Sequence, residues 1–532
     1  PLSGAAPASS CLMLVPRPRD AAYDGDSEED EGEGWSASSQ IAEVFHAPET
    51  FQHVRALPMA AGGLVVLSQR LFRWDSVADR GSAEPRVALA LTAADPAHAG
   101  PCLREPRACL PLPPLGVRLA LAAAQALRCP AEEGRAPNSL ERLGLLWELF
   151  CVHAEAFTED FCDAVGSAKA AHYERLADLE GGPSLLLEPS AEAGIFDFPA
   201  KASAGSQRDA EVWPTVVVSP RDLDSEWNPF EVLLVQGENR DFWRKLCPWL
   251  SVGSAAAEAM AKQAAFDPGP EALGLREALV QEGYFAVPGG VLPWMVDIPG
   301  VARGIQELVA RGFPPVCILM YDEPWVVAAQ LEKLAWVTTG GNELSFDWAA
   351  FCVRAGAGPA RSDEAAAKAQ TTPPAGWPPH RDRGSNNAAA RGFRPDGTPR
   401  YVTFWVPLTD ATPESSCLHV VPRPGDPGYR AGDGRNSAIQ SVFRRPEDFR
   451  RIRAVPLAAG GLMAFTHRVF HWGSAADPRA PAPRVAIAFP AVDPSFETGC
   501  FWQPQALRPM PPLELRLSLA AAQVLVYAAN ER

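Results

Sequence analysis

The feature that most constrains the fold of this chain is an internal repeat, in which three short blocks each occur twice. Residues 10–18 (SCLMLVPRP) return as 416–424 (SCLHVVPRP), 60–64 (AAGGL) as 458–462, and 85–90 (PRVALA) as 483–488 (PRVAIA). The offset is 406 residues at the first block and 398 at the later two. Such distant repeats are typical of duplicated domains, since solenoid units recur at much shorter periods. Because the chain starts inside a repeat and without Met, we expect a fragment of a longer tandem protein.

Composition narrows the class of protein. The formal net charge of −16 and a pI near 5.1 argue against nucleic-acid binding, which needs a basic face. No apolar run is long enough for a membrane span. The 11 cysteines include no C-x-x-C pair, which fits reduced thiols in a reducing compartment such as the cytoplasm, although targeting is not readable. A length of 532 residues predicts two to four domains.

Many short apolar runs separated by turns favour a β-sandwich or barrel over a doubly wound sheet. We expect three parts: residues 1–129 as the C-terminal half of a first domain, 130–265 as a helical and irregular linker, and 266–532 as a complete domain. Predicted helices cover 117–127, 140–179, 255–265, 301–311 and 515–529. Predicted strands cover 64–67, 87–91, 216–218, 232–235, 316–320, 401–406, 417–421, 461–466 and 484–489.

The residues that carry chemistry begin with His380 and Asp382, in the stretch WPPHRDR. A His-x-Asp pair plus one distant His is the ligand set of a 2-His-1-carboxylate iron site, which leaves positions open for a co-substrate and O2. The distant ligand is His467 or His471, which share one face of a strand, so periodicity does not choose between them. The following Gly-Ser and the spacing to Arg484 favour His471.

Around these residues the chain resembles the phytanoyl-CoA dioxygenase family of Fe(II)/2-oxoglutarate oxygenases, over roughly 282–526 and in part over 1–125. The resemblance implies an α+β fold with a mainly β core: a double-stranded β-helix, or cupin-like jelly roll, with flanking helices. It implies that His380, Asp382 and His471 ligate iron, and that Arg484 binds the distal carboxylate of 2-oxoglutarate, as a guanidinium fork suits. Further candidates for the co-substrate pocket are Ser474, Thr403 and Trp405, for which ordinary barrel packing is the alternative. The chain departs from the family pattern at Ala486, where a polar residue is common.

The first copy differs where the chemistry would lie. Gln69 stands opposite His467, Arg73 opposite His471 and Asp75 opposite Gly473, while Arg86 matches Arg484. A guanidinium has no lone pair to offer a metal, so we expect the first copy to be metal-free.

The predicted function is that of an Fe(II)- and 2-oxoglutarate-dependent dioxygenase, which uses O2 to hydroxylate an unidentified small-molecule or lipid-like substrate and converts 2-oxoglutarate to succinate. The substrate is not readable, because one fold hosts many substrates. The alternative is a non-catalytic tandem jelly-roll scaffold or binding protein, since the first copy has lost the metal ligands.

Overall fold

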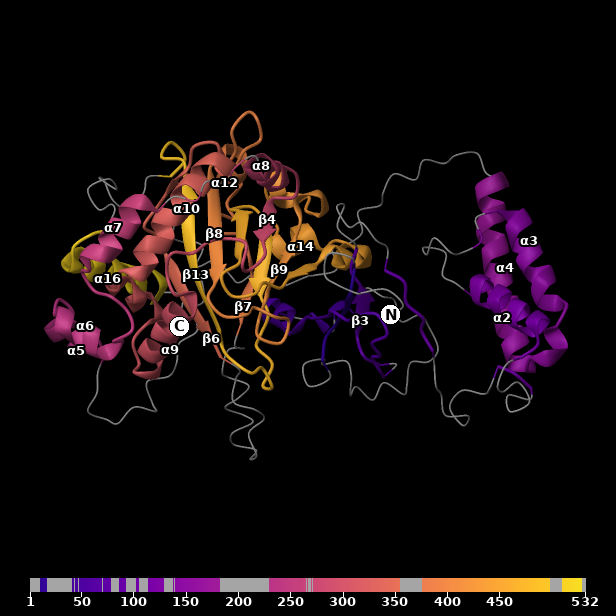
Figure 1. Cartoon of the computed structure of the whole chain (residues 1–532). Helices are drawn as coiled ribbons and strands as arrows, with labels where there is room; N and C mark the ends of the chain where they lie inside the picture. The colour runs from indigo at the N-terminus through magenta and orange to yellow at the C-terminus, as the bar shows by residue number, and fades with distance from the viewer. Residues whose placement is uncertain are drawn as a thin grey trace. The chain divides into compact units, whose positions relative to one another are not determined.

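The computed structural model describes residues 10–16, 41–77, 86–91, 102–104, 113–128, 137–181, 229–354, 376–497 and 510–528, apart from single positions and short gaps at 43, 46, 69, 138, 265, 267–268 and 270. It contains two compact units (Figure 1). One spans Leu89–Ala193, and the other combines Pro1–Ala88 with Gly194–Arg532. The predicted strand at 216–218 lies outside the described residues.

The smaller unit is a small helical bundle. It contains α2 (Leu115–Leu127), α3 (Leu140–Cys151), η3 (Ala154–Ala156) and α4 (Glu159–Gly181) around a core that includes Phe150 and Phe157. Ser139 caps α3 by accepting a hydrogen bond from the backbone of Arg142, which satisfies a free amide at the helix start. The helices predicted at 117–127 and 140–179 are confirmed. The boundary expected between 129 and 130 separates α2 from α3 and α4, which the structure packs together.

The larger unit is built on two antiparallel sheets. The smaller sheet has the order β10-β9-β12-β7, and the larger has β4-β11-β8-β13-β5, with β6 also paired to β13. Along the chain from β7 to β13 the strands pass back and forth between these two sheets, as in a jelly roll. The jelly-roll prediction is confirmed, as are the strands at 401–406, 417–421, 461–466 and 484–489. The bounds are β4 Tyr284–Val287, β5 Glu343–Leu344, β6 Ala349–Val353, β7 Trp377–His380, β8 Tyr401–Pro407, β9 Leu418–Val421, β10 Arg453–Val455, β11 Leu462–Thr466, β12 Phe470–Gly473 and β13 Arg484–Val492.

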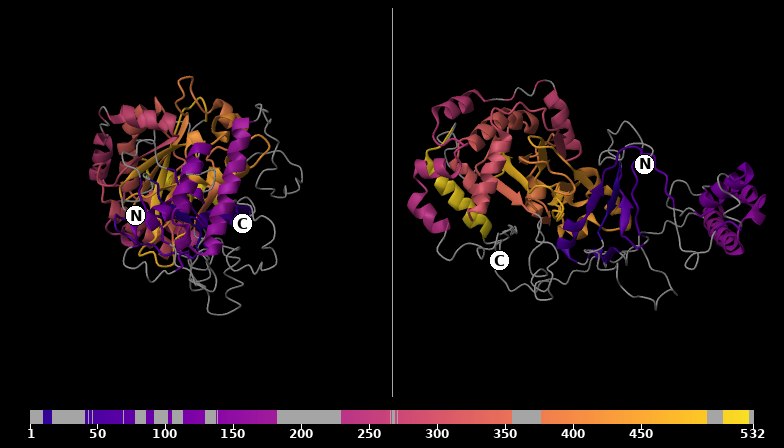
Figure 2. Two further views of the ribbon diagram at one scale, coloured as in Figure 1. Left: turned by 90° about the vertical axis from the view of Figure 1, so that its right-hand side faces the viewer. Right: turned by 60° about the horizontal axis from the view of Figure 1, so that its bottom comes forward.

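Helices cover the outer face of the larger sheet (Figure 2). Strand β8 shows why: Val402, Phe404 and Val406 join the core beneath the helices, whereas Trp405 belongs to the core on the other side of the sheet. Thr403 therefore shares the barrel interior with Trp405. The covering helices include α9 (Ile298–Ala310), η5 (Pro315–Met320), α10 (Glu323–Thr339) and α16 (Leu513–Ala528). Further helices of the larger unit are α5 (Pro229–Gln236), α6 (Arg240–Leu246), α7 (Ala255–Gln263), α8 (Glu271–Gln281), α12 (Asn386–Arg391), η6 (Arg423–Gly425), α13 (Gly428–Ala431), α14 (Ala438–Val442) and η7 (Pro446–Arg451).

Two predicted strands in this unit are wrong. Residues 232–235 lie in helix α5, and 316–320 lie in the 3-10 helix η5. Both are short apolar runs, and periodicity alone does not separate a buried strand from a buried helical turn at that length. The helices predicted at 255–265, 301–311 and 515–529 are confirmed as α7, α9 and α16.

The N-terminal residues form a third, three-stranded sheet with the order β2-β1-β3. Its strands are β1 (Leu12–Leu14), β2 (Arg55–Leu57) and β3 (Arg73–Asp75). This order matches β10-β9-β12 at the repeat offsets, and the pairing registers match as well. Met13 lies opposite Ala56 and Trp74, as His419 lies opposite Ala454 and Trp472.

Local backbone detail also agrees between the matching segments. Ser10 and Ser416 both adopt left-handed backbone, with φ of 74° and 76°, and they are the non-glycine residues recorded with positive φ in the described chain. The predicted strands at 64–67 and 87–91 are wrong, because both segments are irregular and mostly exposed. In the jelly roll the corresponding segments pair with β8, and the described N-terminal residues include no counterpart of β8.

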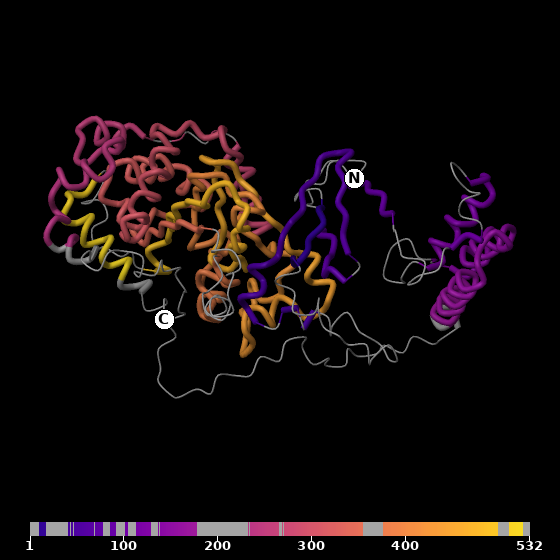
Figure 3. Tube along the Cα trace, turned by 90° about the horizontal axis from the view of Figure 1, so that it is seen from below, coloured from indigo at the N-terminus to yellow at the C-terminus, as the bar shows by residue number. Residues whose placement is uncertain are grey.

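The N-terminal sheet packs on the jelly roll through reciprocal contacts (Figure 3). The Trp472 indole donates to the carbonyl oxygen of Phe51 in η2 (Pro48–His53) at 3.0 Å. The Trp74 indole donates to the carbonyl oxygen of Phe449 in η7, also at 3.0 Å. Phe51 and Phe449 stack on each other with centroids 5.9 Å apart. We call the N-terminal sheet and the jelly roll the two β-units. Each β-unit supplies the same groups to the other, as in an isologous interface.

A second pair of backbone hydrogen bonds repeats this symmetry. The amide of Ala475 donates to the carbonyl of Gln52, and the amide of Val77 donates to that of Arg450, both at 2.7 Å.

Within the described residues, no helix is long and apolar enough to cross a membrane.

Candidate functional site

Strand pairing brings the predicted metal ligands together. His380 ends β7, Asp382 follows in the next turn, and His471 on β12 is the direct cross-strand partner of His380. The Asp382 Oδ1 atom lies 3.6 Å from His380 Nε2 and 3.5 Å from His471 Nε2. One ligand atom from each of the three residues lies within 4.8 Å of the others, and within the described chain this is the His/Cys/Asp/Glu group that could hold a metal ion.

The outer atoms of these side chains are fixed by hydrogen bonds. His380 Nδ1 lies 2.7 Å from the Pro378 carbonyl oxygen, and His471 Nδ1 lies 3.0 Å from that of Val469. An Nδ1–H that donates to a carbonyl leaves the lone pair on Nε2, which in both residues faces Asp382. The Thr403 hydroxyl donates to the other Asp382 oxygen, Oδ2. The residues therefore fit a divalent ion held by two neutral imidazoles and one carboxylate.

The charge states of the ligands agree with that geometry. Burial, and then the neighbouring His380, lower the pKa of His471 to about 3, so its ring is neutral at neutral pH. Burial alone would raise the pKa of Asp382. The neighbouring His380 and His471 side chains and the Thr403 hydroxyl outweigh burial and hold the pKa of Asp382 below its usual value.

Arg484 lies at the start of β13 inside the barrel and is only 2% exposed. Its guanidinium lies 5.6 Å from the Trp405 ring centroid and 6.0 Å from that of Phe351. Its Nε has no hydrogen-bond partner, and no carboxylate in the described chain pairs with it. Burial lowers the pKa of Arg484 to about 10. A buried guanidinium without an anion is costly, so this position is suited to receive a carboxylate from a ligand.

Gly473 leaves room beside this guanidinium. A Cβ atom at Gly473 would lie 3.5 Å from Nη2 of Arg484 and 3.4 Å from the Cβ of Trp377. The missing side chain therefore keeps open the space on the Gly473 side of the Arg484 guanidinium.

The N-terminal sheet handles the matching arginine differently. Arg86 forms a 2.7 Å ion pair with Asp75, the residue that stands opposite Gly473. Arg73, which stands opposite His471, donates to the carbonyl oxygens of Ser68 and Leu71. Gln69 lies outside the described residues. In this sheet an internal carboxylate occupies the partner position of the arginine.

The other predicted contacts divide between the site and the surrounding packing. Thr403 touches Asp382 and Trp405 lies beside Arg484, as expected for pocket residues. The Ser474 hydroxyl instead donates to the Cys417 carbonyl oxygen at 3.4 Å, as that of Ser76 does to Cys11 at 3.2 Å. Ser474 therefore links the end of β12 to the start of β9.

His467, the rival ligand, lies away from the cluster. Its Nδ1 is 3.2 Å from the Tyr401 carbonyl oxygen, and its Nε2 is 3.4 Å from that of Ala388. The ring packs against Phe393 and Phe496, and burial lowers its pKa to about 4. His467 is therefore a packed, neutral histidine outside the group of candidate metal ligands.

Sequence reasoning missed Arg381, the residue between the two ligands of the His-x-Asp pair. Its buried guanidinium binds Asp426 Oδ1 at 2.8 Å through Nη2, and Asp433 Oδ2 at 3.0 Å through Nε. Arg468 joins the same network through a 3.1 Å ion pair with Asp433. Arg381 thereby anchors the turn between His380 and Asp382 to a loop far along the chain. The alternation of side chains on a strand places Arg381 opposite its neighbours, but its partners lie in irregular loops.

Comparison with known protein families finds a match to the segment that holds the candidate metal ligands. Residues 344–480 match the family model described as "Phytanoyl-CoA dioxygenase (PhyH)". That segment contains His380, Asp382 and His471, and it ends just before Arg484. Among curated proteins, no sequence matches the chain.

Several solved structures resemble part of the chain. The epimerase SnoN from nogalamycin biosynthesis, described as non-heme and α-ketoglutarate dependent, is 19% identical over 43% of this chain and 82% of its own, with a TM-score of 0.31. EctD from S. alaskensis, solved with 2-oxoglutarate and 5-hydroxyectoine, is 13% identical over 41% of this chain and 75% of its own, with a TM-score of 0.27. Similarity at this level says nothing about the substrate of this chain.

The family match agrees with the ligand cluster and with the cofactors predicted from it, Fe(II) and 2-oxoglutarate. Residues 344–480 of this chain therefore match the phytanoyl-CoA dioxygenase family of Fe(II)- and 2-oxoglutarate-dependent oxygenases.

Proposed function

We propose that residues 266–532 hydroxylate a small-molecule or lipid-like substrate while 2-oxoglutarate is converted to succinate. In this proposal His380, Asp382 and His471 ligate Fe(II), and Arg484 binds the distal carboxylate of 2-oxoglutarate. The observation that carries the proposal is the pairing of a complete ligand cluster with a buried guanidinium that has no anion of its own.

Each side chain has a defined task. The two Nε2 atoms and one Asp382 oxygen would occupy one side of the ion and leave its other positions open. When bound, Fe(II), 2-oxoglutarate and O2 together would supply the oxidising chemistry that inserts one oxygen atom into a C–H bond. Thr403 keeps Asp382 in place through its hydrogen bond. The Trp405 ring beside Arg484 excludes water there, which strengthens the attraction of the guanidinium for a carboxylate.

Anaerobic titration of Fe(II) and 2-oxoglutarate into the whole chain tests the proposal, with the visible charge-transfer band of the chelate as the readout. We expect a saturable band. His380→Ala should abolish it, because a ligand is lost. Arg484→Gln should keep the band but require at least tenfold more 2-oxoglutarate, since about 1.4 kcal/mol of binding energy corresponds to a factor of ten. The absence of a band from well-folded protein would refute the proposal in favour of a non-catalytic scaffold.

We further propose that residues 1–129 include a degenerate copy of the jelly roll that serves as a non-catalytic scaffold. The matching strand order, matching registers and shared left-handed serines support a common origin for the two β-units. The Asp75–Arg86 ion pair supports the loss of co-substrate binding, because the arginine is already neutralised. The hydrogen bond from Trp472 to Phe51 supports a scaffolding role, because Trp472 is adjacent to His471 on β12.

Phe51→Asp tests the scaffolding role, since a carboxylate would enter the aromatic cluster that joins the two β-units. We expect weaker Fe(II) binding and faster amide hydrogen exchange in β12, with exchange in β8 little changed. Leu64→Ala alters an exposed residue of the same N-terminal region and should leave both readouts unchanged. Wild-type iron affinity and β12 protection in a folded Phe51→Asp variant would contradict the role.

A further inference from the structure

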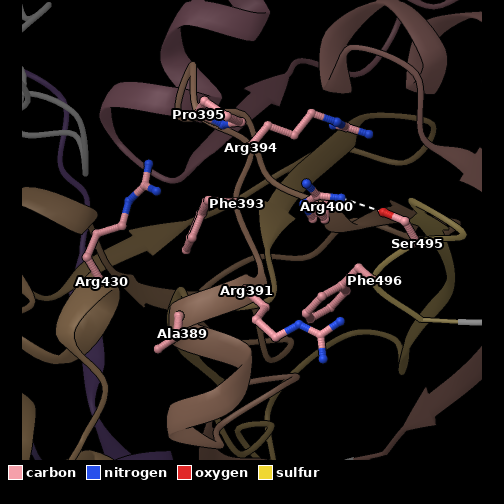
Figure 4. A pocket seen from close by; sticks show the side chains of 10 residues that line it. Ala389, Arg391, Phe393, Arg394, Pro395, Arg400, Arg430, Ser495 and Phe496 are labelled. Atoms are coloured by element: carbon pink, nitrogen blue, oxygen red, sulfur yellow. Dashed lines mark hydrogen bonds between the residues drawn. The ribbon is translucent and has the colours of Figure 1, made fainter.

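A pocket of about 670 Å³ lies outside the residues assigned above (Figure 4). Its side chains come from helix α12, the loop that leads to β8, helix α13 and the segment after β13. Four arginines and two phenylalanines dominate the lining. The lining residues are Ala389, Ala390, Arg391, Phe393, Arg394, Pro395, Arg400, Arg430, Ser495 and Phe496.

The pocket lies at the same end of the barrel as the metal ligands. Strand β7 ends at His380 and β8 begins at Tyr401, so the loop between them lies at the ligand end. Strand β13 ends beside the start of β8, because Val492 pairs with Tyr401. Arg484, at the opposite end of β13, is therefore far from this loop. The pocket therefore lies at the end of the barrel that carries the metal ligands, and Arg484 lies toward the other end.

The charges of the pocket do not cancel. Asp493 pairs with both Arg394 and Arg400, at 2.9 and 3.0 Å, so one carboxylate serves two guanidinium groups. Within the described chain, neither Arg391 nor Arg430 has a carboxylate partner. Such an excess of positive charge in one concavity stands out in a protein of formal net charge −16. A concave surface lined with one sign of charge concentrates ions of the opposite sign.

Two of the arginines are held in position before any ligand binds. The Arg430 guanidinium lies 3.6 Å from the Phe393 ring centroid and donates to the Gly397 carbonyl oxygen at 3.0 Å. Arg394 donates to Asn342 Oδ1 at 2.7 Å as well as to Asp493. Guanidinium groups fixed in this way lose little side-chain entropy on binding an anion.

His467 connects the pocket to the segment that carries the metal ligands. The His467 ring lies 5.1 Å from that of Phe393 and 5.4 Å from that of Phe496, between centroids. The backbone of His467 accepts a hydrogen bond from the amide of Arg383, the residue after Asp382. A group bound in the pocket would therefore be adjacent to the turn that carries the metal ligands.

We propose that this pocket anchors a dianionic oxyanion, of phosphate or sulfate type, carried by the substrate of the oxygenase site. The substrate assignment rests on the proposed function, whereas the anion site itself does not. A dianion matches the pocket better than a monocarboxylate, because four arginines line it and a single carboxylate, that of Asp493, pairs with two of them. The rest of the substrate would extend past His467 toward the iron ligands.

Binding of radiolabelled sulfate to the metal-free whole chain, measured by equilibrium dialysis at low salt, tests the anion site. Sulfate is a dianion that does not compete strongly for iron, so the same probe serves later assays. We expect saturable binding that weakens as chloride is added. The double variant Arg391→Gln/Arg430→Gln should bind at least tenfold more weakly. Arg311→Gln, which removes a half-exposed arginine that directly follows helix α9 and does not line the pocket, should bind like wild type. Equal binding by all three proteins would overturn the site.

A second arm distinguishes a substrate anchor from a free regulatory anion. Succinate release by the iron-loaded protein is measured with and without saturating sulfate, in the absence of any organic substrate. Unchanged background release is expected of an anchor, because sulfate alone presents no C–H bond. A change in release that is lost in the double variant would assign the pocket to a free regulatory anion and overturn the anchor. Absence of the charge-transfer band would refute the oxygenase proposal while leaving sulfate binding to the metal-free protein intact.

Discussion

Replacing Gly473 with Asp should give Arg484 an ion pair like the one seen between Asp75 and Arg86 in the N-terminal region. There, Asp75 stands at the matching position and binds Arg86 at 2.7 Å. A Cβ atom at Gly473 would lie 3.5 Å from Nη2 of Arg484, in ordinary contact, so an aspartate carboxylate can reach the guanidinium without displacing the strand. The new carboxylate would compete with 2-oxoglutarate for the same donors.

The size of the effect follows from the hydrogen bonds that change partner. Hydrogen bonds to charged groups contribute about 1.5–3 kcal/mol each. At about 1.4 kcal/mol per factor of ten, capture of Arg484 by the new aspartate should weaken 2-oxoglutarate binding roughly 10- to 100-fold. Because Arg484 is buried without an anion, the same substitution should raise the free energy of unfolding.

Anaerobic titration of 2-oxoglutarate into the Fe(II)-loaded protein measures the first effect, and denaturant unfolding of the metal-free protein measures the second. Gly473→Asn is the matched control, since it has the same shape without the charge. We expect the Asp variant to bind 2-oxoglutarate at least tenfold more weakly than the Asn variant. Equal affinities in the two variants would mean that only bulk matters and would refute the ion-pair reasoning.

Three side chains near the site give further tests. Arg381→Met should lower the free energy of unfolding by about 3–5 kcal/mol, because it leaves buried carboxylates unpaired, as chemical denaturation would show. Burial lowers the pKa of His419 to about 3, so the native state stays unprotonated while the unfolded chain takes up a proton below about pH 6.5. As the pH falls from 7 to 5, His419 should therefore lower the free energy of unfolding by up to about 1.4 kcal/mol per pH unit, and His419→Met, which copies Met13, should remove that contribution while those of His467 and His471 remain. His467→Asn should retain the charge-transfer band and His471→Asn should lose it, whereas the reverse result would exchange their roles.

The convergence of His380 and Asp382 was predictable from sequence because both residues lie in one short segment. His380 and Asp382 are separated by one residue, so a single turn after a strand brings both side chains to one place. The choice between His467 and His471 needed the pairing register, in which His471 lies directly opposite His380. Register depends on contacts between strands that are distant in the sequence, and residues of one strand face share one periodicity. The sequence therefore left two candidates where the structure brings one to the cluster.

The network around Arg381 and the contact between the two β-units were not predictable for a different reason. Asp426 and Asp433 belong to irregular segments after β9, where no periodicity indicates which side chains turn inward. The hydrogen bonds that join the two β-units end on backbone carbonyls of Phe51 and Phe449, and any residue type offers a carbonyl. Such acceptors leave no trace in a sequence pattern.

Matching positions of the two β-units fall into two groups, those that hold the same residue and those that differ. Positions that hold the same residue in both units include Phe51/Phe449 and Trp74/Trp472, and these side chains make the shared interface. Positions that differ include Arg73/His471 and Asp75/Gly473, which in the jelly roll lie at the ligand cluster or beside Arg484. On β3 and β12 the two differing positions flank the shared tryptophan, Trp74 or Trp472. The side chain that joins the two β-units is therefore retained between two neighbours whose chemistry differs.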